Sequence, residues 1–376
     1  MIFEYAHSLS ALMKKREIKI VAPAKVNLLL SVGERFPDGY HRVSTVISRL
    51  RLADTILLSD NDVGQVRLSS SLDGDLLRQA LVTGELGRLE ERLSGSANIV
   101  WKALDLYRRN TSQLDKHIGL DVHITKRIPL DAGLGGGSAD AASVLLALND
   151  RDCGVLSTEG LEEIAAELGA DVPCLLHRHP VAGVNRGERV VELAMPGAFC
   201  EGLSLVGCLL LKPPQGSSTA AAYRLLNRPV KADMRGVSPG CACASCEKTC
   251  APDLEIIENF KSDFANRWLT LYGDAGSRQH ARQLGADFIG IASAVFVNDF
   301  QSFLSAEYSW SGMAQAWLAD VGAGLVLLCG SGSCYFGFFP SCEDAEVALS
   351  ALKSLVPEDW FIDRTSFAAA NWNLSL

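Results

Sequence analysis

The feature that most constrains the fold is a glycine-rich loop that joins an expected strand to an expected helix. Residues 118–124 alternate apolar and polar side chains, a pattern that is typical of a half-buried strand. Residues 139–148 are mainly alanine and leucine, which are strong helix formers. Because glycine adopts positive φ without steric cost, the chain is able to turn sharply from the strand into the helix. The loop contains four glycines followed by a serine: Gly133, Gly135, Gly136, Gly137 and Ser138.

The same loop predicts an anion-binding site at the start of the helix. We expect Ser138 to be the N-cap residue, in front of a first turn of small side chains. Unpaired N–H groups and the positive end of the helix dipole both favour an anion such as a triphosphate. A tight turn without a ligand is the alternative, but four glycines beside a serine favour binding. The loop lacks the Gly-Lys-Ser/Thr ending of a P-loop, and Ser138 replaces the last glycine of a dinucleotide-binding loop.

The length of 376 residues predicts about two domains, since a typical domain has roughly 150 residues. Met195–Gly197 marks a boundary, so we expect one domain over residues 1–198 and a second over 199–376. Strands expected early in the chain and helices expected later favour an α+β fold. The apolar run Leu203–Leu211 predicts the first strand of the second domain. Residues 228–253 lack periodicity and predict an irregular insertion.

The charge and composition exclude several classes of function. With 35 Lys and Arg against 44 Asp and Glu, the net charge is −9, which argues against a nucleic-acid partner. The longest apolar run is shorter than the ~20 residues of a membrane-spanning helix, so we expect no membrane partner. Most of the 11 cysteines are scattered in apolar contexts and residues 1–20 lack a secretory pattern, which together favour the cytoplasm. The sequence leaves open whether the chain is a monomer or a homodimer.

Several segments together resemble one family of enzymes. The loop PLDAGLGGGSADAA, which begins at Pro129, resembles the nucleotide loop of the GHMP kinases, which include galactokinase, homoserine kinase and mevalonate kinase. Residues 23–28 (PAKVNL) and 38–41 (DGYH) resemble the start of the 4-diphosphocytidyl-2-C-methyl-D-erythritol kinase family. Residues 169–173 (GADVP) and 330–333 (GSGS) are similar to later motifs of that family and follow in its order. Any one segment could occur by chance, but the ordered set is specific.

This resemblance implies both a fold and an activity. The fold is the two-domain α+β GHMP kinase fold, with a ribosomal protein S5 domain 2-like N-terminal domain and an α/β C-terminal domain. The activity is ATP-dependent phosphorylation of the 2-hydroxyl of a cytidyl diphosphate sugar alcohol in the non-mevalonate isoprenoid pathway. One alternative is a GHMP kinase of the homoserine or mevalonate type, which has no cytosine for residues 38–41 to hold. A second alternative is a non-catalytic nucleotide-binding relative, which the retained loop and catalytic residues speak against.

Phosphoryl transfer requires a positioned acceptor hydroxyl and a group that takes its proton. The resemblance implies that Asp171 is this general base and that Lys25 lies beside it. An opposite charge within ~4–6 Å favours the ionised form of a carboxylate. Taken alone, Asp171 would be an ordinary turn residue and Lys25 an ordinary strand-end lysine, but the order of the segments favours the catalytic roles.

The resemblance also implies how the acceptor substrate is held. Tyr40 would stack on the cytosine ring, His41 would bond the edge of the base, and Tyr223 would cover its other face. Without the resemblance these would be a packed tyrosine, a solvated histidine and a helix-core residue. Asn27 points to the same side of its strand as Lys25, two residues away. The predicted substrate-binding residues are Asn27, Tyr40, His41, Thr219 and Tyr223.

ATP would lie against the glycine loop, with Mg²⁺ bridging its phosphate oxygens. Ser138 is the one protein ligand that we expect for this ion. Asn98 and Lys126 match positions near the adenine pocket of the family, although a helix N-cap and a surface lysine are the ordinary alternatives. The predicted ATP-binding residues are Pro129, Gly133, Leu134, Gly135, Gly136, Gly137, Ser138, Asn98 and Lys126. An active-site loop that closes over the phosphates is predicted at Gly330, Ser331, Gly332 and Ser333.

Four cysteines cluster in the expected insertion, at Cys241, Cys243, Cys246 and Cys250. Thiolates at this density are able to hold a structural zinc ion in tetrahedral geometry. Zinc sites usually pair two Cys-x-x-Cys arms across a long spacer, whereas these four lie in one short stretch. A mobile insertion with free thiols is therefore the competing interpretation.

Overall fold

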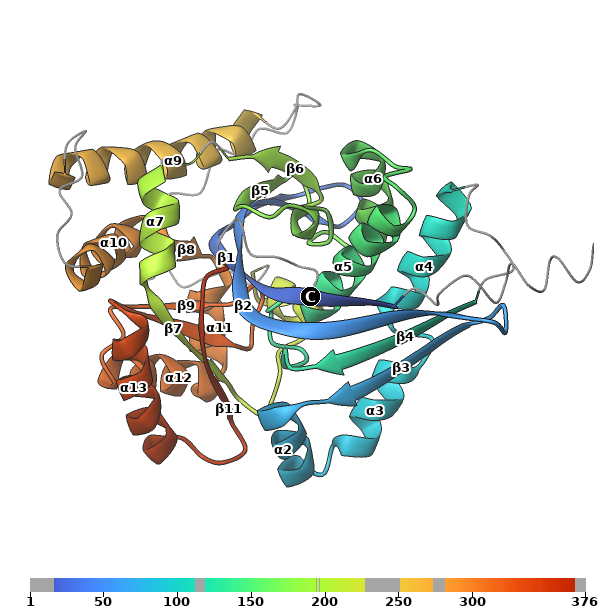
Figure 1. Ribbon diagram of the computed structural model, residues 1–376. Helices are drawn as coiled ribbons and strands as arrows, with labels where there is room; N and C mark the ends of the chain where they lie inside the picture. Colours follow the sequence, from blue (N-terminus) through green and yellow to red (C-terminus); the bar gives the residue numbers. More distant parts are fainter. Residues whose placement is uncertain are drawn as a thin grey trace, which may run out of the picture.

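The computed structural model describes residues 17–111, 119–193, 195, 197–226, 251–272 and 281–368, which form two sheets and the helices that cover them (Figure 1). The strands are β1 (Glu17–Arg35), β2 (His41–Asn61), β3 (Val66–Leu72), β4 (Gly119–Lys126), β5 (Val181–Val184), β6 (Arg189–Glu192), β7 (Gly207–Lys212), β8 (Val297–Asn298), β9 (Leu325–Leu328), β10 (Tyr335–Phe339) and β11 (Phe361–Ser366). The helices are α2 (Gly74–Thr83), α3 (Leu86–Ser94), α4 (Ile99–Asn110), α5 (Gly136–Arg151), α6 (Thr158–Leu168), the 3-10 helix η1 (Pro173–Leu176), α7 (Gly197–Leu205), α8 (Thr219–Leu226), α9 (Ala251–Tyr272), α10 (Ala281–Val295), α11 (Phe300–Glu307), α12 (Ser309–Asp320) and α13 (Cys342–Leu355). The cysteine cluster, Cys241, Cys243, Cys246 and Cys250, lies outside the described residues.

The first sheet is built around two long antiparallel strands, β1 and β2. Its order is β3-β4-β2-β1-β8, with β5 paired to β2 and β6 paired to β5. The register of β1 against β2 shifts between Pro23 and Lys25, and again between Asn27 and Leu29. Proline has no N–H for the ladder, and a shift of this kind re-aims the side chains around it. Lys25 and Asn27 therefore lie in the irregular middle of β1.

Helices α4, α5 and α6 cover one face of this sheet (Figure 1). Apolar side chains of β1, β2 and β4 pack there against Val100, Leu145 and Ile164, one from each helix. The first turns of α5 contain small residues, and Ala141 and Ala142 are buried against the sheet side. Small side chains allow α5 to approach β1 closely, so the start of this helix lies beside the middle of the strand.

The second sheet has the order β11-β7-β10-β9 and is antiparallel throughout. Side chains along β7 alternate between its two faces, as a strand requires. Cys208 and Leu210 join an apolar cluster with α7 and α10, whereas Leu209 and Leu211 join another with α12 and α13. The first of these clusters also contains Leu28 of β1, so the two sheets share a core. The later part of the chain even returns to the first sheet, because β8 pairs with β1.

The two sheets and their helices confirm the predicted α+β fold. The expected boundary after residue 198 falls at the start of α7 and stays a prediction. The expected strand Leu203–Leu211 is wrong in its first part, which belongs to α7, and β7 begins only afterwards. An unbroken apolar run does not distinguish a buried helix from a buried strand. Gly202 lets α7 lie against Phe288 of α10, because a Cβ there would be 2.1 Å from a ring carbon.

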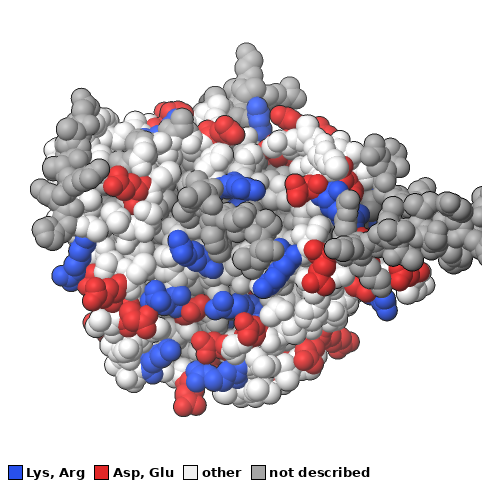
Figure 2. Space-filling model, in the orientation of Figure 1, with Lys and Arg blue, Asp and Glu red and all other residues white. Residues whose placement is uncertain are grey.

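None of the described helices is long and apolar enough to cross a membrane. Figure 2 shows one face of the molecule, on which the described Lys and Arg side chains are interspersed with Asp and Glu. Mixing of this kind leaves local positive and negative places on that face, so the charges that matter for a ligand have to be found residue by residue.

Candidate active site

Lys25 and Asp171 form the centre of the candidate site, although they lie far apart in the chain. The Nζ atom of Lys25 is 3.0 Å from Oδ2 of Asp171. The lysine side chain is 4% exposed, whereas the aspartate side chain is 34% exposed. A buried ammonium therefore lies behind a carboxylate that a substrate is able to reach. The ion pair fixes the orientation of the carboxylate, the group that the sequence predicts as the proton acceptor.

A chain of hydrogen bonds holds the lysine in place. Lys25 donates to Oδ1 of Asn27 over 2.8 Å, and Nδ2 of Asn27 donates to Oγ1 of Thr45 over 2.7 Å. Thr45 donates in turn to the backbone oxygen of Leu29 over 2.7 Å. These three side chains belong to buried residues, and a buried network that is fully bonded is rigid. Asn27 thus orients Lys25, while its predicted contact with substrate stays a prediction.

The backbone around Asp171 is fixed by a turn between α6 and η1. The N–H of Val172 donates to the oxygen of Gly169 over 3.1 Å. The N–H of Leu175 donates to the oxygen of Asp171 over 3.3 Å. Pro173 begins η1, with its φ already restricted to a helical value. The GADVP segment is therefore a rigid turn that presents the carboxylate to β1.

The glycine loop lies directly against this pair. Gly135 has a φ of 67°, and a Cβ there would lie 2.8 Å from Cγ of Lys25. Gly133 has a φ of 75°, and a Cβ there would lie 1.9 Å from the backbone oxygen of Cys329. The N–H of Lys25 donates to the oxygen of Leu134 over 2.9 Å. Glycine is required at both positions, because the loop is held tightly between β1 and the segment after β9.

The helix after the loop begins earlier than the sequence predicts. Gly135 is the N-cap of α5, so Ser138 lies in the first turn and not at the cap. The physical reason is that the positive φ of Gly135 already makes the turn, and glycine is itself an acceptable N-cap. The first N–H that bonds within the helix is that of Ala139, which donates to the oxygen of Gly135 over 2.8 Å. The N–H groups before it point out of the helix, toward a ligand or water.

Lys126 lies beneath the loop, where a Cβ at Gly136 would be 3.4 Å from its Nζ atom. Its ammonium bonds the carboxylates of Asp54 and Asp140, the latter over 2.6 Å, and the residue is 1% exposed. Asp54 also accepts the N–H groups of Arg127 and Ile128, over 2.6 and 2.8 Å. A contact with adenine would require the ammonium to leave both carboxylates. Lys126 joins the end of β4 to the first turn of α5, and its predicted contact with ATP stays a prediction.

This triad shares one positive charge between two buried carboxylates. Burial raises the pKa of Asp140 to about 8; Lys126 opposes the rise, and the charge of Asp54 adds to it. The Oδ1 atom of Asp140 is buried and has no hydrogen-bond partner among the described residues. A protonated Asp140 would leave the carboxylate of Asp54 as the counter-charge of the ammonium. The support of the loop therefore depends on pH.

We expect the melting temperature of Asp140→Asn to fall less with rising pH than that of the wild type. The folded pKa is above the ordinary carboxyl value, so the folded state holds a proton that the unfolded state releases. This contribution is complete below about pH 4 and is lost as the pH passes about 8. The measurement is the melting temperature from about pH 6 to about pH 9. Asp121→Asn, in an exposed ion pair with Arg67, is the control, and equal slopes for Asp140→Asn and wild type would contradict the expectation.

The aromatic residues predicted for cytosine lie in two places. The ring centroids of His41 and Tyr223 are 5.1 Å apart at 30°, and Phe300 meets Tyr223 edge-on at 4.9 Å. Tyr40 is 64% exposed, and the guanidinium of Arg186 lies over its ring, 5.1 Å from the centroid. A base between two flat groups needs about 7 Å, twice the contact distance of carbon atoms. His41 and Tyr223 are therefore in contact and do not enclose a base, and the stacking role of Tyr40 stays a prediction.

Tyr223 connects the aromatic residues with the catalytic pair. Burial raises the pKa of Tyr223 to about 12, and the negative charge of Asp171 adds to the rise. The hydroxyl therefore keeps its proton at neutral pH and is a hydrogen-bond donor. The charge of Asp171 acts on this hydroxyl, so the carboxylate lies within electrostatic reach of Tyr223.

The predicted active-site loop, residues 330–333, closes another side of the site. A Cβ at Gly330 would lie 3.2 Å from Nζ of Lys25, which places the loop beside the ion pair. Asn298 anchors the loop by donating to the oxygen of Gly330 over 2.7 Å. Ser331 donates to Oγ1 of Thr219 over 3.1 Å, so both of these predicted residues lie here. Asn298 is the anchor that sequence reasoning missed, since its bond depends on the pairing of β8 with β1.

Three other predicted ATP-binding residues serve the packing of the loop and the helices. Asn98 is the N-cap of α4: its Oδ1 accepts the N–H of Val100 over 3.0 Å, and its Nδ2 donates to the oxygen of Leu93 over 2.7 Å. This amide is engaged by the backbone, so an adenine contact stays a prediction. Pro129 and Leu134 are buried, Leu134 within an apolar cluster, and their predicted contacts with ATP stay predictions.

Several known proteins are similar to this chain. Residues 98–179, which include the loop and Asp171, match the family described as GHMP kinases N terminal domain. A crystal structure of 4-(cytidine 5'-diphospho)-2C-methyl-D-erythritol kinase aligns with a TM-score of 0.59 and 25% identity, covering 93% of this chain and 99% of that one. The 4-diphosphocytidyl-2-C-methyl-D-erythritol kinase of Citrifermentans bemidjiense is 30% identical over 309 residues, 81% of this chain and 98% of that protein. The kinase of that name from Geobacter sp. strain M21 is 33% identical over 211 residues, 56% of this chain and 66% of that protein.

The fold and the site together define the class of protein. Two packed sheets hold a glycine loop against a lysine–carboxylate pair, as expected of a GHMP kinase, and the loop and Asp171 lie within the residues that match the family. The relative from Citrifermentans bemidjiense is matched over almost its whole length, which narrows the class further. The chain belongs to the 4-diphosphocytidyl-2-C-methyl-D-erythritol kinase family. The predicted fold and the predicted family are thereby confirmed.

Proposed function

We propose that this chain transfers the γ-phosphoryl group of ATP to the 2-hydroxyl of 4-diphosphocytidyl-2-C-methyl-D-erythritol, a step of isoprenoid synthesis by the non-mevalonate route. The observation that carries the proposal is the 3.0 Å pair of Lys25 and Asp171, placed directly against the glycine loop. The names of the relatives supply the identity of the substrate. We expect the pyrimidine to contact the aromatic side chains of His41 and Tyr223, which lie against each other.

In this proposal Asp171 takes the proton of the acceptor hydroxyl as the new P–O bond forms. Its carboxylate is exposed enough to meet the hydroxyl, and the turn that carries it is rigid. The transition state of phosphoryl transfer spreads negative charge over the phosphoryl oxygens. Lys25 lies between Asp171 and Gly330, where an ammonium stabilises that charge without having to move.

The start of α5 is the proposed cradle for the phosphates of ATP. Its first-turn N–H groups and helix dipole favour a polyanion, and the glycines allow close approach to the backbone. Ser138 is partly exposed in this turn, and its hydroxyl is the protein ligand we propose for Mg²⁺. The fit is reasonable because Mg²⁺ bound to a nucleotide usually keeps several waters and needs few protein ligands. When bound, this ion neutralises phosphate charge.

Tyr223→Ala should raise the KM for the cytidyl substrate by about 5- to 150-fold, since stacking on a base contributes about 1–3 kcal/mol. The KM for ATP should change little, because Tyr223 lies with His41 and not on the glycine loop. Steady-state kinetics with each substrate varied in turn makes the measurement. Tyr223→Phe keeps the ring and is the matched control. A change confined to the KM for ATP would show that the aromatic assignment is wrong.

The proposal is tested by offering ATP and Mg²⁺ to the purified chain with one acceptor at a time. The acceptors are 4-diphosphocytidyl-2-C-methyl-D-erythritol, homoserine and mevalonate, and release of ADP is followed. We expect turnover with the cytidyl compound alone. Turnover with homoserine or mevalonate in its place would assign another GHMP activity. If no acceptor leads to release of ADP although the protein still binds ATP, the chain is a non-catalytic relative.

A further inference from the structure

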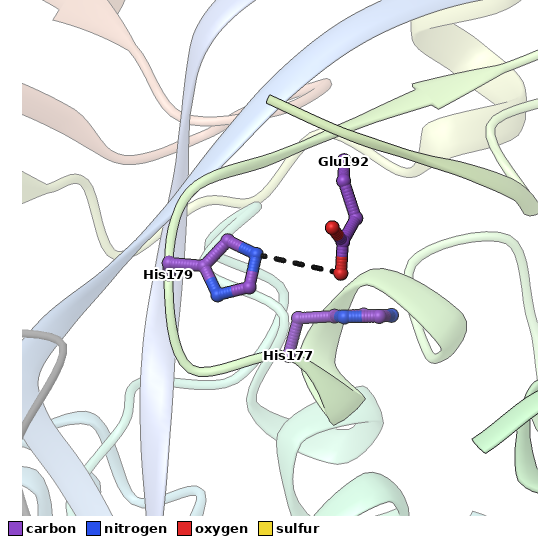
Figure 3. Close-up of side chains that lie close together, drawn as sticks. All are labelled: His177, His179 and Glu192. Atoms are coloured by element: carbon purple, nitrogen blue, oxygen red, sulfur yellow. Dashed lines mark ion pairs between the residues drawn. The ribbon is translucent and has the colours of Figure 1, made fainter. Parts of the chain in front are cut away.

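Two histidines and a glutamate that take no part in the proposed reaction lie together beside the β5–β6 hairpin. Figure 3 shows the Glu192 carboxylate next to the rings of His177 and His179. One ligand atom from each residue lies within 4.8 Å of the other two. The side chain of His177 is 9% exposed, and those of His179 and Glu192 are 42% and 76% exposed. The cluster is therefore open to an ion from solvent on one side and packed on the other.

The backbone brings these three residues together in a defined way. Glu192 is the last residue of β6 and is paired with Val181, the first residue of β5. His179 precedes Val181 by two residues, so the hairpin register sets it near the carboxylate. His177 directly follows η1, and its N–H donates to the oxygen of Cys174 over 3.4 Å. A hairpin and the end of a 3-10 helix thus converge on one point.

One hydrogen bond joins the cluster to a carboxylate behind it, as is common for a histidine that binds a metal. The Nε2 atom of His177 lies 2.8 Å from Oε1 of Glu162, a residue of α6. A carboxylate that accepts from one imidazole nitrogen fixes the tautomer and leaves the lone pair of the other nitrogen for a metal. The Nε2 atom of His179 is 4.0 Å from Oε1 of Glu192, which is too far for a hydrogen bond. These two atoms do not bond each other, so an ion between them would accept a lone pair from each when Nε2 of His179 carries no proton.

We propose that His177, His179 and Glu192 bind one divalent transition-metal ion of the zinc type, with water as the fourth ligand. Ligands around tetrahedral zinc are about 3.4 Å apart, given bonds of about 2.0–2.1 Å. The spread of up to 4.8 Å has to close to this value, and we infer that the exposed side chains of His179 and Glu192 rotate to do so. Two imidazoles and one carboxylate favour Zn²⁺, Co²⁺ or Ni²⁺ over Mg²⁺, which prefers oxygen ligands. This site is therefore separate in chemistry from the one that would serve ATP.

The ion would tie the β5–β6 hairpin to the segment that follows the catalytic turn. Residues 171–177 run from Asp171 through η1 to His177, so one end of that rigid segment is the base and the other is a metal ligand. Binding to the folded state alone stabilises a protein in proportion to the logarithm of the free ion concentration. We expect the melting temperature to rise with added metal and the phosphoryl-transfer step itself to be unaffected.

Titration of the full chain with Co²⁺ alone tests the proposal, because cobalt reports its ligands in its absorption spectrum. We expect one equivalent of cobalt to bind and to give visible absorption bands. The near-ultraviolet absorption that charge transfer from thiolate to cobalt produces should be absent. His179→Ala should remove this equivalent, and Glu162→Gln should weaken it about tenfold, the usual effect of losing the carboxylate behind a ligating histidine. His123→Ala is the matched control, since His123 on β4 bonds Ser69 and Ser71 and is remote in sequence from the cluster.

Three outcomes would overturn the proposal. One is that wild type and His179→Ala bind the same number of cobalt equivalents, when a thermal unfolding transition shows that both proteins are folded. Another is cobalt bound with thiolate absorption alone, which would assign the metal to cysteines such as Cys241 and Cys243. Loss of binding in His123→Ala as well would show that the histidines bind cobalt without a built site.

Discussion

Asp171→Asn should reduce turnover by about 10²–10⁴-fold, the usual contribution of a positioned general base. Asparagine has nearly the same shape as aspartate, and its oxygen still accepts a hydrogen bond from Lys25. It does not take up a proton at neutral pH, so the acceptor hydroxyl has to lose its proton to water. The KM of either substrate should change little, because the substitution removes an interaction made in the transition state. Initial rates of ADP release at saturating substrates give the turnover number.

The matched control is an aspartate that forms an ion pair but is not the proposed base. Asp60 is 3.2 Å from Arg151, and its side chain is 20% exposed, so Asp60→Asn makes the same chemical change elsewhere in the first sheet. We expect it to turn over at close to the wild-type rate. If Asp171→Asn is also near the wild-type rate, Asp171 is not the base and the role of Lys25 has to be assigned again.

The sequence predicts those parts of the site in which a residue type is itself required. Gly133 and Gly135 have positive φ and leave no space for a Cβ, so both positions require glycine. A residue type that is required in this way can be recognised in the sequence. The resemblance of short ordered segments to a known family implies that Lys25 and Asp171 are neighbours, and the structure places their charged atoms 3.0 Å apart. The α+β class follows from the same reading, because strands and helices differ in their apolar period.

The sequence does not predict features that depend on distant parts of the chain. Lys126 has the sequence pattern of a strand-end lysine, and its burial becomes evident only once Asp54 and Asp140 are placed around it. The anchoring of residues 330–333 by Asn298 requires β8 to pair with β1, two segments far apart in the chain. The cluster around His177 likewise depends on the register of a hairpin. In each case the missing information is tertiary, and no local period contains it.

Gly135→Ala should reduce turnover by about 100-fold, because it displaces the lysine that stabilises the transferred group. The new Cβ would lie 2.8 Å from Cγ and 3.0 Å from Cε of Lys25, well inside contact distance. The lysine stem is buried and its ammonium is bonded to Asn27, so the clash moves the ammonium away from Asp171. The φ of 67° adds about 1–2 kcal/mol of strain for any residue with a Cβ.

Gly137→Ala is the comparison that separates this cause from a general intolerance of the loop. Gly137 is two residues further on, without positive φ, and a Cβ there would meet only Cγ2 of Ile99 at an ordinary 3.6 Å. Both variants are measured at saturating ATP, so that a change in nucleotide affinity does not enter the turnover number. We expect Gly137→Ala to keep most of the wild-type turnover and Gly135→Ala to lose it, although both proteins fold. Equal turnover in the two variants would mean that the close approach of Gly135 to Lys25 has no catalytic consequence, and the ammonium would then act from more than one position.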